Sequence, residues 1–219
     1  ADTRARISYL WFHGMRAIIG MRIRQIGTPP EAPYFLVVNH LTWGDLFAMK
    51  CLCRARFVLQ ADDGSFPLLG RLLLALNPVL VHRVREEVPM ARRSMEEAIE
   101  QGDSLLMAPE GVVGPGKEIR RFRAALLDAA VRKHKPVHYA SITYRTPKGC
   151  PPPSQAVLFG PDPYFRTPDG KIPQSELDAW GPERSFLPHF LRLLALPWHE
   201  VTIHFAPTPI WHAERIALA

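Results

Sequence analysis

The sequence contains few cysteines. Only Cys51, Cys53 and Cys150 occur among 219 residues, too few for the disulfide framework of a secreted scaffold. No further cysteine or histidine stands at zinc-ligand spacing from Cys51 and Cys53, and no His-x-x-x-His pair is flanked by a glutamate. The sequence therefore predicts reduced thiols that pack as small apolar side chains, and no metal site.

Long apolar runs are also absent. No stretch reaches the roughly 18 consecutive apolar residues that a bilayer-spanning helix requires. The sequence shows no signal peptide and begins with alanine instead of methionine, which is typical of a processed or excised piece. We therefore expect any membrane-spanning segment to lie upstream of this chain.

Acidic residues are fewer than basic ones. Lysine and arginine number 27 against 21 aspartates and glutamates, so the formal net charge is +6 and the isoelectric point is about 9.5. This balance suits an acidic partner, such as nucleic acid, anionic lipid headgroups or an acidic carrier protein. Because no basic block interleaved with aromatic residues is present, we expect lipid or a carrier protein and no nucleic acid.

We expect residues 1–30 to form an amphipathic N-terminal helical segment and residues 31–219 to form the main domain. A helix is predicted over residues 4–24, where apolar side chains, among them Trp11, are interspersed with arginines. Such an amphipathic helix can lie in a membrane interface, or it can pack on a sheet with its arginines in water. One helix can do both, so the sequence leaves the two alternatives open.

Most of the chain alternates between short apolar runs and amphipathic segments. This pattern predicts a single α/β domain with a largely parallel or mixed central sheet flanked by helices, and 219 residues suffice for one buried core. Strands are predicted at residues 34–38, 56–60, 78–83, 104–107, 137–144, 156–159 and 201–205. Helices are predicted after Gly44 and at residues 66–76, 89–101, 123–133 and 186–196, with a long loop over residues 161–182.

His40 and Asp45 stand on either side of a predicted strand-to-helix turn. The run at residues 34–38 predicts a buried strand, so His40 follows its carboxyl end, where open α/β sheets place their sites. The turn can bring the carboxylate onto one imidazole nitrogen, which fixes the tautomer and stabilises the imidazolium once the histidine takes a proton. The alternative is a histidine and a helix N-terminal aspartate that never meet.

Four motifs follow one another along the chain: Asn39-His40 with Asp45, then Val79–Arg83, Ala108–Gly111 and Lys135–Ala140. Their order and spacing resemble the glycerolipid acyltransferase family, whose best-known members are the lysophosphatidic acid acyltransferases. The resemblance implies that His40 is the general base and Asp45 its orienting partner. It also implies that a fatty acyl group moves from acyl-coenzyme A or acyl carrier protein, as co-substrate, directly to the hydroxyl of a lysolipid, with no other cofactor.

The same resemblance implies a binding site for the acceptor headgroup. It assigns Arg83, Glu110, Gly111 and Lys117 to this site, with Asn39, Gly44, Arg121 and Arg123 as additional candidates. Backbone N–H groups near the two glycines are candidates for binding the oxyanion. The family usually has threonine and arginine after Glu-Gly, where this chain has Val112 and Val113. The missing arginine removes one expected phosphate ligand and leaves room for another headgroup, including that of lyso-ornithine lipids.

Three alternatives to a lysophosphatidic acid acyltransferase remain open. They are a lyso-ornithine lipid acyltransferase, a thioester hydrolase that uses water as acceptor, and a non-catalytic module that binds lipid or carrier protein. The chain has no Gly-x-Ser-x-Gly motif, which argues against a serine hydrolase. The expected location is the cytoplasmic face of the inner membrane, with the protein bound peripherally to anionic lipids or anchored by a segment missing from this chain.

Overall fold

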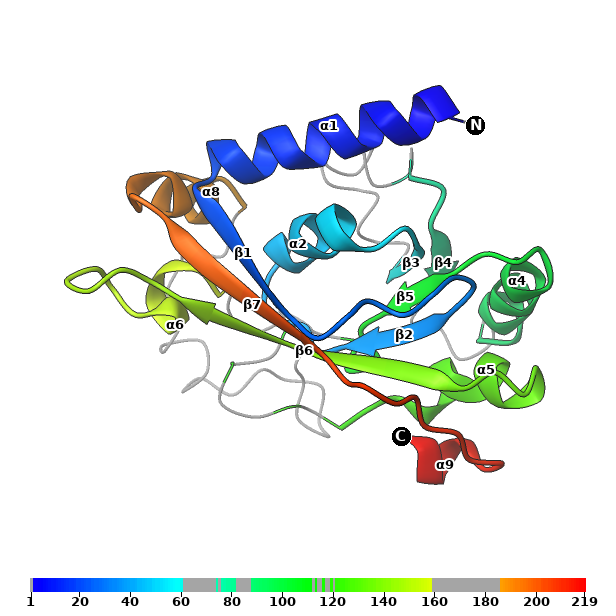
Figure 1. The fold of residues 1–219 in the computed structure, drawn as a ribbon. Coiled ribbons are helices and arrows are strands. Elements are labelled where there is room, and N and C mark those ends of the chain that lie inside the picture. Colours follow the sequence, from blue (N-terminus) through cyan, green and yellow to red (C-terminus); the bar gives the residue numbers. More distant parts are fainter. Residues whose placement is uncertain are drawn as a thin grey trace.

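A seven-stranded sheet runs through the protein in the order β1-β7-β6-β2-β5-β3-β4 (Figure 1). The computed structural model describes residues 2–60, 74, 76–81, 88–111, 113, 116, 119, 121–158 and 186–219. The strands are β1 (Met21–Ile26), β2 (Phe35–Val38), β3 (Arg56–Gln60), β4 (Val79–Val81), β5 (Leu105–Met107), β6 (Val137–Arg145) and β7 (His199–Phe205). The described helices are α1 (Asp2–Ile18), α2 (Gly44–Leu52), α4 (Val88–Glu100), the 3-10 helix η3 (Ala124–Leu127), α5 (Asp128–Arg132), α6 (Pro153–Ala156), α8 (Phe186–Ala195) and α9 (Arg215–Leu218).

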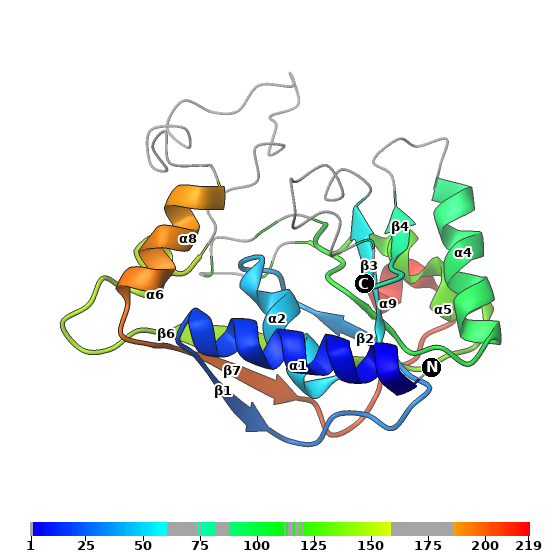
Figure 2. The ribbon, with the colours of Figure 1, turned by 90° about the horizontal axis from the view of Figure 1, so that it is seen from above.

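The sheet is mixed. Strands β2 to β6 run parallel to one another, β6 pairs with β7 antiparallel, and β7 pairs with β1 parallel. Parallel strands end at a common edge, toward which the arrowheads of β3 and β4 point in Figure 2. His40 follows β2 after a single residue, Asn39, and therefore lies at this carboxyl edge.

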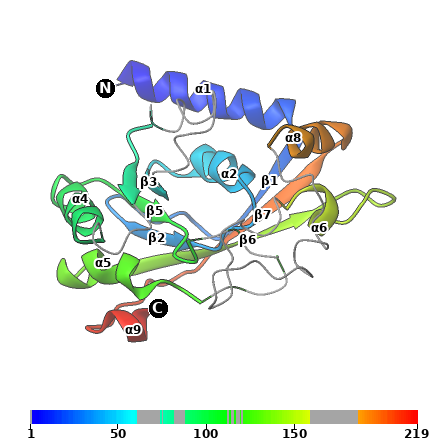
Figure 3. The ribbon, with the colours of Figure 1, turned by 180° about the vertical axis from the view of Figure 1, so that it is seen from behind.

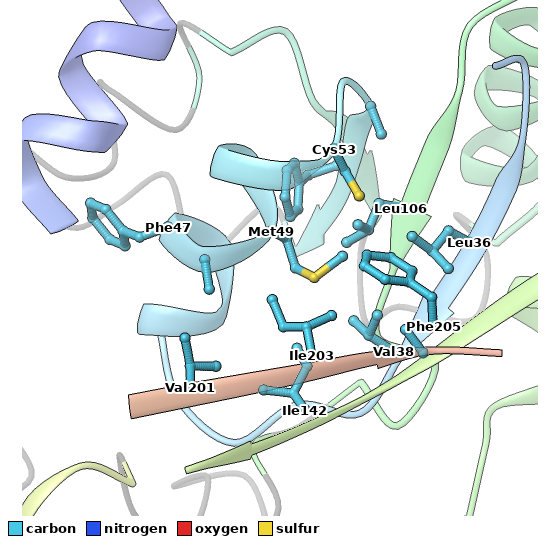
Figure 4. Packing of buried hydrophobic residues seen from close by; sticks show 14 of the residues in the cluster. Leu36, Val38, Phe47, Met49, Cys53, Leu106, Ile142, Val201, Ile203 and Phe205 are labelled. Carbon is cyan, nitrogen blue, oxygen red and sulfur yellow. The ribbon is translucent and has the colours of Figure 1, made fainter. Parts of the chain in front are cut away.

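The central strand β2 is buried on both faces, as expected of a parallel strand covered by helices. Leu36 and Val38 belong to a core cluster that includes Phe47 of α2 and residues of α1 (Figure 4). Phe35 and Val37 belong to a second cluster, formed with α4, η3, α5 and α9. Figures 1 and 3 accordingly show α1 and α2 on one side of the sheet and α5 and α9 on the other.

The N-terminal helix is shorter than the sequence predicted. Helix α1 ends at Ile18, Gly20 takes a φ of +64°, and Met21–Ile26 form the edge strand β1 beside β7. The prediction of a helix over residues 4–24 was therefore wrong at its C-terminal end. Residues 21–24 alternate apolar and basic side chains, which is a strand pattern. The prediction took them as a continuation of the helical pattern that precedes them.

The strand predicted at residues 156–159 was also wrong. Pro153–Ala156 form the one-turn helix α6, which begins with proline, where the missing N–H breaks no hydrogen bond. Val157 follows as the C-cap and is buried in a small cluster with Leu193 of α8. A short apolar segment that is buried against a helix can have the same composition as a strand, so composition alone does not distinguish the two.

The remaining predictions of secondary structure are confirmed where the structure describes the residues. The other strands and the helices after Gly44 and at residues 89–101 and 186–196 agree to within two residues at each end, except that β4 is described only over Val79–Val81. Residues 123–133 begin as η3 and continue as α5. The predicted helix at 66–76, apart from residues 74 and 76, and the predicted loop at 161–182 lie outside the described residues.

Candidate active site

The turn between β2 and α2 brings His40 and Asp45 into contact. Asp45 lies in the first turn of α2, and its Oδ2 atom accepts a 2.9 Å hydrogen bond from Nδ1 of His40. The same oxygen accepts the backbone N–H groups of Leu41 and Thr42, at 2.7 and 3.0 Å. The carboxylate therefore both closes the turn and fixes the imidazole in the tautomer that carries its proton on Nδ1.

Tyr144 of β6 binds the other oxygen of this carboxylate. Its hydroxyl donates a 2.7 Å hydrogen bond to Oδ1 of Asp45, which is itself only 4% exposed. Burial, together with the nearby Asp45 carboxylate, raises the pKa of Tyr144 well above its usual value. Tyr144 therefore remains a protonated donor at any physiological pH.

Glu110 holds the backbone of His40. It follows β5, its side chain is buried, and its Oε1 atom accepts the His40 backbone N–H at 2.8 Å. The sequence placed Glu110 among the headgroup residues, whereas its described contact is with the residue that carries the imidazole. This contact gives Glu110 a part in positioning His40.

Gly111 allows a close approach of Arg123. Its φ is +69°, and a Cβ atom at this position would lie 2.7 Å from Nε of Arg123. The Gly111 N–H donates to the carbonyl of Ala108 at 3.1 Å, so it is already used within the turn. The backbone N–H of Arg123 in turn donates to the carbonyl of Pro109 at 2.8 Å. The glycine thus provides space for a guanidinium beside the Pro-Glu-Gly turn.

Asn39 and Gly44 have structural contacts. The Asn39 side chain donates to the carbonyl of Ile142 and accepts its N–H, at 3.0 and 2.6 Å, which ties the end of β2 to β6. Gly44 is buried at the start of α2, where an added Cβ would lie 3.3 Å from side-chain atoms of both Met21 and Thr42. Both residues therefore shape the turn that presents His40.

A largely apolar cavity of about 240 Å³ opens beside this pair. Among the described residues, the polar lining is formed by His40, Asp45 and Arg123, and Gly111 lies with them. The apolar lining comes from β2, α2, β3, β4, α4, β5, the loop after β5 and η3: Val38, Leu46, Met49, Phe57, Val58, Leu59, Val81, Val88, Ala91, Met95, Leu106, Met107, Ala108, Val113, Ala125 and Leu126. The pocket can therefore hold an apolar chain with one end beside the imidazole.

Of the predicted basic residues, the structure brings only Arg123 to this cavity within the part it describes. Arg121 is exposed and does not line the cavity. Arg83 and Lys117 lie outside the described residues. The cavity wall also contains Val113, the residue at the position where the family usually has arginine.

Trp43 links the turn that contains His40 and Asp45 to α8. Its Nε1–H donates to Nδ1 of His189 at 2.9 Å, and Nε2 of His189 donates to the carbonyl of Val157 at 2.9 Å. Burial lowers the pKa of His189 to about 4, so this imidazole is neutral. Sequence reasoning missed both Trp43–His189 and Tyr144–Asp45, because their partners lie 146 and 99 residues apart and share no motif.

Cys51 and Cys53 lack the acidity of a nucleophilic thiol. All three are free thiols, and burial raises the pKa of Cys53 to about 11 and that of Cys51 above its usual value. Among the described residues, no three histidine, cysteine or acidic side chains gather as metal ligands. The same part of the chain contains no helix that is both long and apolar enough to cross a bilayer.

A mixed sheet with a histidine–aspartate pair at its carboxyl edge and an apolar cavity beside it defines an α/β domain suited to acyl-group chemistry. The chain belongs to the Acyltransferase family, whose model matches residues 21–144, more than half of the sequence. The predicted family and the predicted α/β fold are therefore confirmed.

Two relatives illustrate the range of this family. A lyso-ornithine lipid O-acyltransferase from Pseudomonas aeruginosa is 26% identical over 159 residues, which cover 73% of this chain and 61% of the relative. A 1-acyl-sn-glycerol-3-phosphate acyltransferase from Neisseria gonorrhoeae is 29% identical over 111 residues, 49% of this chain and 44% of the relative. The matched regions thus span 61% of the first relative and 44% of the second, less than two thirds of either.

A solved structure shares the fold. The crystal structure of the 1-acyl-sn-glycerophosphate (LPA) acyltransferase PlsC from Thermotoga maritima superimposes with a TM-score of 0.60 at 16% identity. The match covers 94% of this chain and 68% of that chain. At this identity the likeness concerns the arrangement of helices and strands.

Proposed function

We propose that this protein is an O-acyltransferase that moves a fatty acyl group from the thioester of acyl-coenzyme A or acyl carrier protein to the hydroxyl of a lysolipid. One observation carries the proposal: the His40–Asp45 pair borders an apolar cavity in a chain of the Acyltransferase family. Imidazole, whose unperturbed pKa is about 6.5, is an effective general base at neutral pH.

The chemistry follows from the tautomer. Because Nδ1–H of His40 donates to Asp45, Nε2 is the basic nitrogen, and it takes the proton from the acceptor hydroxyl as its oxygen attacks the thioester carbonyl. The tetrahedral intermediate then expels the thiolate, which receives that proton from the imidazolium, and the ester product forms. The Asp45 carboxylate stabilises the transient imidazolium, and no covalent acyl-enzyme is required because a thioester is already activated.

Arg123 is the described residue best placed to bind an anionic headgroup. Its guanidinium lies over Gly111 and lines the same cavity as His40. The roles of Arg83 and Lys117 rest on the family resemblance alone. With valine at residue 113, the acceptor site has less positive charge than the family pattern offers a phosphate monoester. A lyso-ornithine lipid is therefore the second candidate acceptor. The Pseudomonas aeruginosa relative is named a lyso-ornithine lipid O-acyltransferase.

We place the protein peripherally on the cytoplasmic face of the inner membrane, where lysolipids are available. Helix α8 buries His189 and Leu193 but exposes Leu187, Leu191 and Leu194 by 61%, 55% and 42%. These three leucines lie at i, i+4 and i+7, so they form one apolar face. A helix with such a face can insert into the interfacial region of a bilayer.

An aromatic–basic cluster follows this helix. The guanidinium of Arg22 lies 4.5 Å from the centre of the Trp198 ring, and that of Arg145 lies 5.7 Å from it. Tryptophan and arginine are the side chains that favour the headgroup level of a membrane. The net charge of +6 also favours anionic lipids.

The test is turnover with acyl-coenzyme A or acyl carrier protein and a panel of lysophosphatidic acid, lyso-ornithine lipid and zwitterionic lysophospholipids. We expect acceptor-dependent ester formation, and a fall in kcat of about 10² to 10⁴ in a folded His40→Ala protein. Acyl release that proceeds equally well without any lysolipid would establish the hydrolase instead. Binding of lipid without turnover would establish the non-catalytic module.

A further inference from the structure

We propose that Tyr144 is a positioning residue of the acyl transfer, and that its hydrogen bond to Asp45 sets both the orientation of the carboxylate and the basicity of His40. The inference rests on the proposed function, because it concerns the residue that takes the acceptor proton. The contact involves β6 (Val137–Arg145), and none of the site residues predicted from the sequence lies on this strand. It therefore adds a third side chain to the His40–Asp45 pair.

The two carboxylate oxygens of Asp45 accept hydrogen bonds from different donors. Oδ2 of Asp45 accepts Nδ1 of His40 and two backbone N–H groups of the turn. Oδ1 accepts the hydroxyl of Tyr144 at 2.7 Å. Donors on Oδ2 alone leave the carboxylate able to pivot about that oxygen, whereas donors on both oxygens restrict this tilt. Tyr144 thus helps to fix the orientation in which Asp45 meets the imidazole.

Tyr144 itself is well anchored. It lies in the antiparallel pairing of β6 with β7, opposite Val201, and it packs against the central core cluster. Asn39 binds the backbone of Ile142, two residues earlier on the same strand. The end of β2 and the hydroxyl that reaches Asp45 are therefore held by one rigid strand.

The electrostatic consequence has a definite sign. A hydroxyl that donates to Asp45 draws negative charge away from the carboxylate, so the carboxylate stabilises the His40 imidazolium less strongly. This keeps the pKa of His40 lower and leaves more of the imidazole in its basic form near neutral pH. Loss of the hydroxyl should therefore raise the pKa of His40.

The experiment compares Tyr144→Phe with Tyr139→Phe. Phenylalanine keeps the ring and removes only the hydroxyl, and Tyr139 is a half-exposed tyrosine on the same strand that makes no contact with Asp45 in the described contacts. Two quantities are measured for each folded protein: the pKa of His40 by NMR titration of ¹⁵N-labelled imidazoles, and the pH profile of kcat/KM.

For Tyr144→Phe we expect the pKa of His40 to rise by about 0.5 to 1 unit and the acidic limb of kcat/KM to move to higher pH by the same amount. We expect kcat to fall about tenfold with KM unchanged, and Tyr139→Phe to match the wild type. A fall in kcat with an unmoved His40 pKa would show a merely structural role and overturn the proposal. An unchanged profile would overturn it as well.

Incorporation of 3,5-difluorotyrosine at residue 144 provides a second variant should Tyr144→Phe fail to fold. Its hydroxyl is a stronger donor, so the pKa of His40 should fall below the wild-type value, and a rise or no change would contradict the proposal. The imidazole titration needs no substrate. Absence of turnover in the wild type would therefore refute the proposed acyl transfer without affecting the measurement of the Tyr144 contact.

Discussion

The backbone N–H of His40 donates a 2.8 Å hydrogen bond to Oε1 of Glu110, although the two residues are 70 positions apart. The contact joins the turn after β2 to the turn after β5, two neighbouring parallel strands. It means that the Pro-Glu-Gly turn helps to determine where the imidazole lies. The two motifs of the sequence thus form one structural unit at the carboxyl edge of the sheet.

This contact predicts a difference between two substitutions of Glu110. Glu110→Ala removes a buried acceptor and should lower the free energy of unfolding by roughly 1 to 3 kcal/mol, with a fall in kcat. Glu110→Gln keeps an oxygen that can accept the His40 N–H, so it should retain most of the stability and most of kcat. Chemical denaturation and kcat measure the effect, with Glu97→Ala on the exposed side of α4 as the control. If the Gln variant is as inactive as the Ala variant, Glu110 acts through its charge and not by positioning.

A second prediction concerns the acceptor headgroup. Arg123→Ala should raise KM for anionic lysolipids by about ten- to a hundredfold, since a hydrogen bond to a charged group is worth roughly 1.5 to 3 kcal/mol. Arg121→Ala, which alters an exposed neighbour outside the cavity, should change KM little. Val113→Arg should improve the use of lysophosphatidic acid relative to the other acceptors. Equal effects of the two alanine substitutions would remove Arg123 from the headgroup site.

Two buried histidines make stability depend on pH. Burial lowers the pKa of His189 and of His199 from 6.5 to about 4. Between pH 4 and pH 6.5 the unfolded chain binds protons that the folded chain does not. The free energy of unfolding therefore keeps the full contribution of these histidines above pH 6.5 and loses it as the pH falls toward 4. Each histidine should contribute up to about 3 kcal/mol to this loss, from a pKa difference of about 2.5 units.

Urea denaturation at pH 7 and pH 5 measures this loss. His199→Leu, which has a similar volume and no titrating group, should reduce the loss of stability, whereas His204→Gln at an exposed position on the same strand should not. An equally steep pH dependence in the His199→Leu protein would assign the effect to other groups.

The fourth prediction concerns the membrane. Combining Leu187→Ser with Leu191→Ser should weaken binding to vesicles that contain anionic lipid, because both side chains are exposed on α8. Salt should weaken binding of the wild type as well. Vesicle flotation measures the effect of the double substitution and the effect of salt. The control is Ile216→Ser on α9, where the side chain is 73% exposed.

Deletion of residues 1–26 is unsuitable as a test because it would also remove β1 from the sheet. Equal binding of the double variant and the control would exclude α8 from the contact.

Local pattern determined most of the secondary structure. An apolar run predicts the buried strand Phe35–Val38, and helical periodicity predicts the helix Val88–Glu100. Both elements lie where the sequence predicted them. The pattern failed at Met21–Ile26 and at the strand predicted over residues 156–159, where the described residues 156–158 end α6 and follow it. In both places a short segment has a composition that suits helix and strand alike, and the pairing with β7 or the packing against α8 decides.

The sequence by itself determined the candidate pair His40 and Asp45, because residues five apart across a strand-to-helix turn meet through local backbone geometry. It also determined the family, through the order of short motifs. Only the tertiary structure decided that Tyr144 binds Asp45, that His189 binds Trp43 and that Glu110 holds the His40 backbone. These contacts join segments 70 to 146 residues apart, and their hydrogen bonds exist only once the strands and α8 are packed, so no periodicity or spacing in the sequence records them.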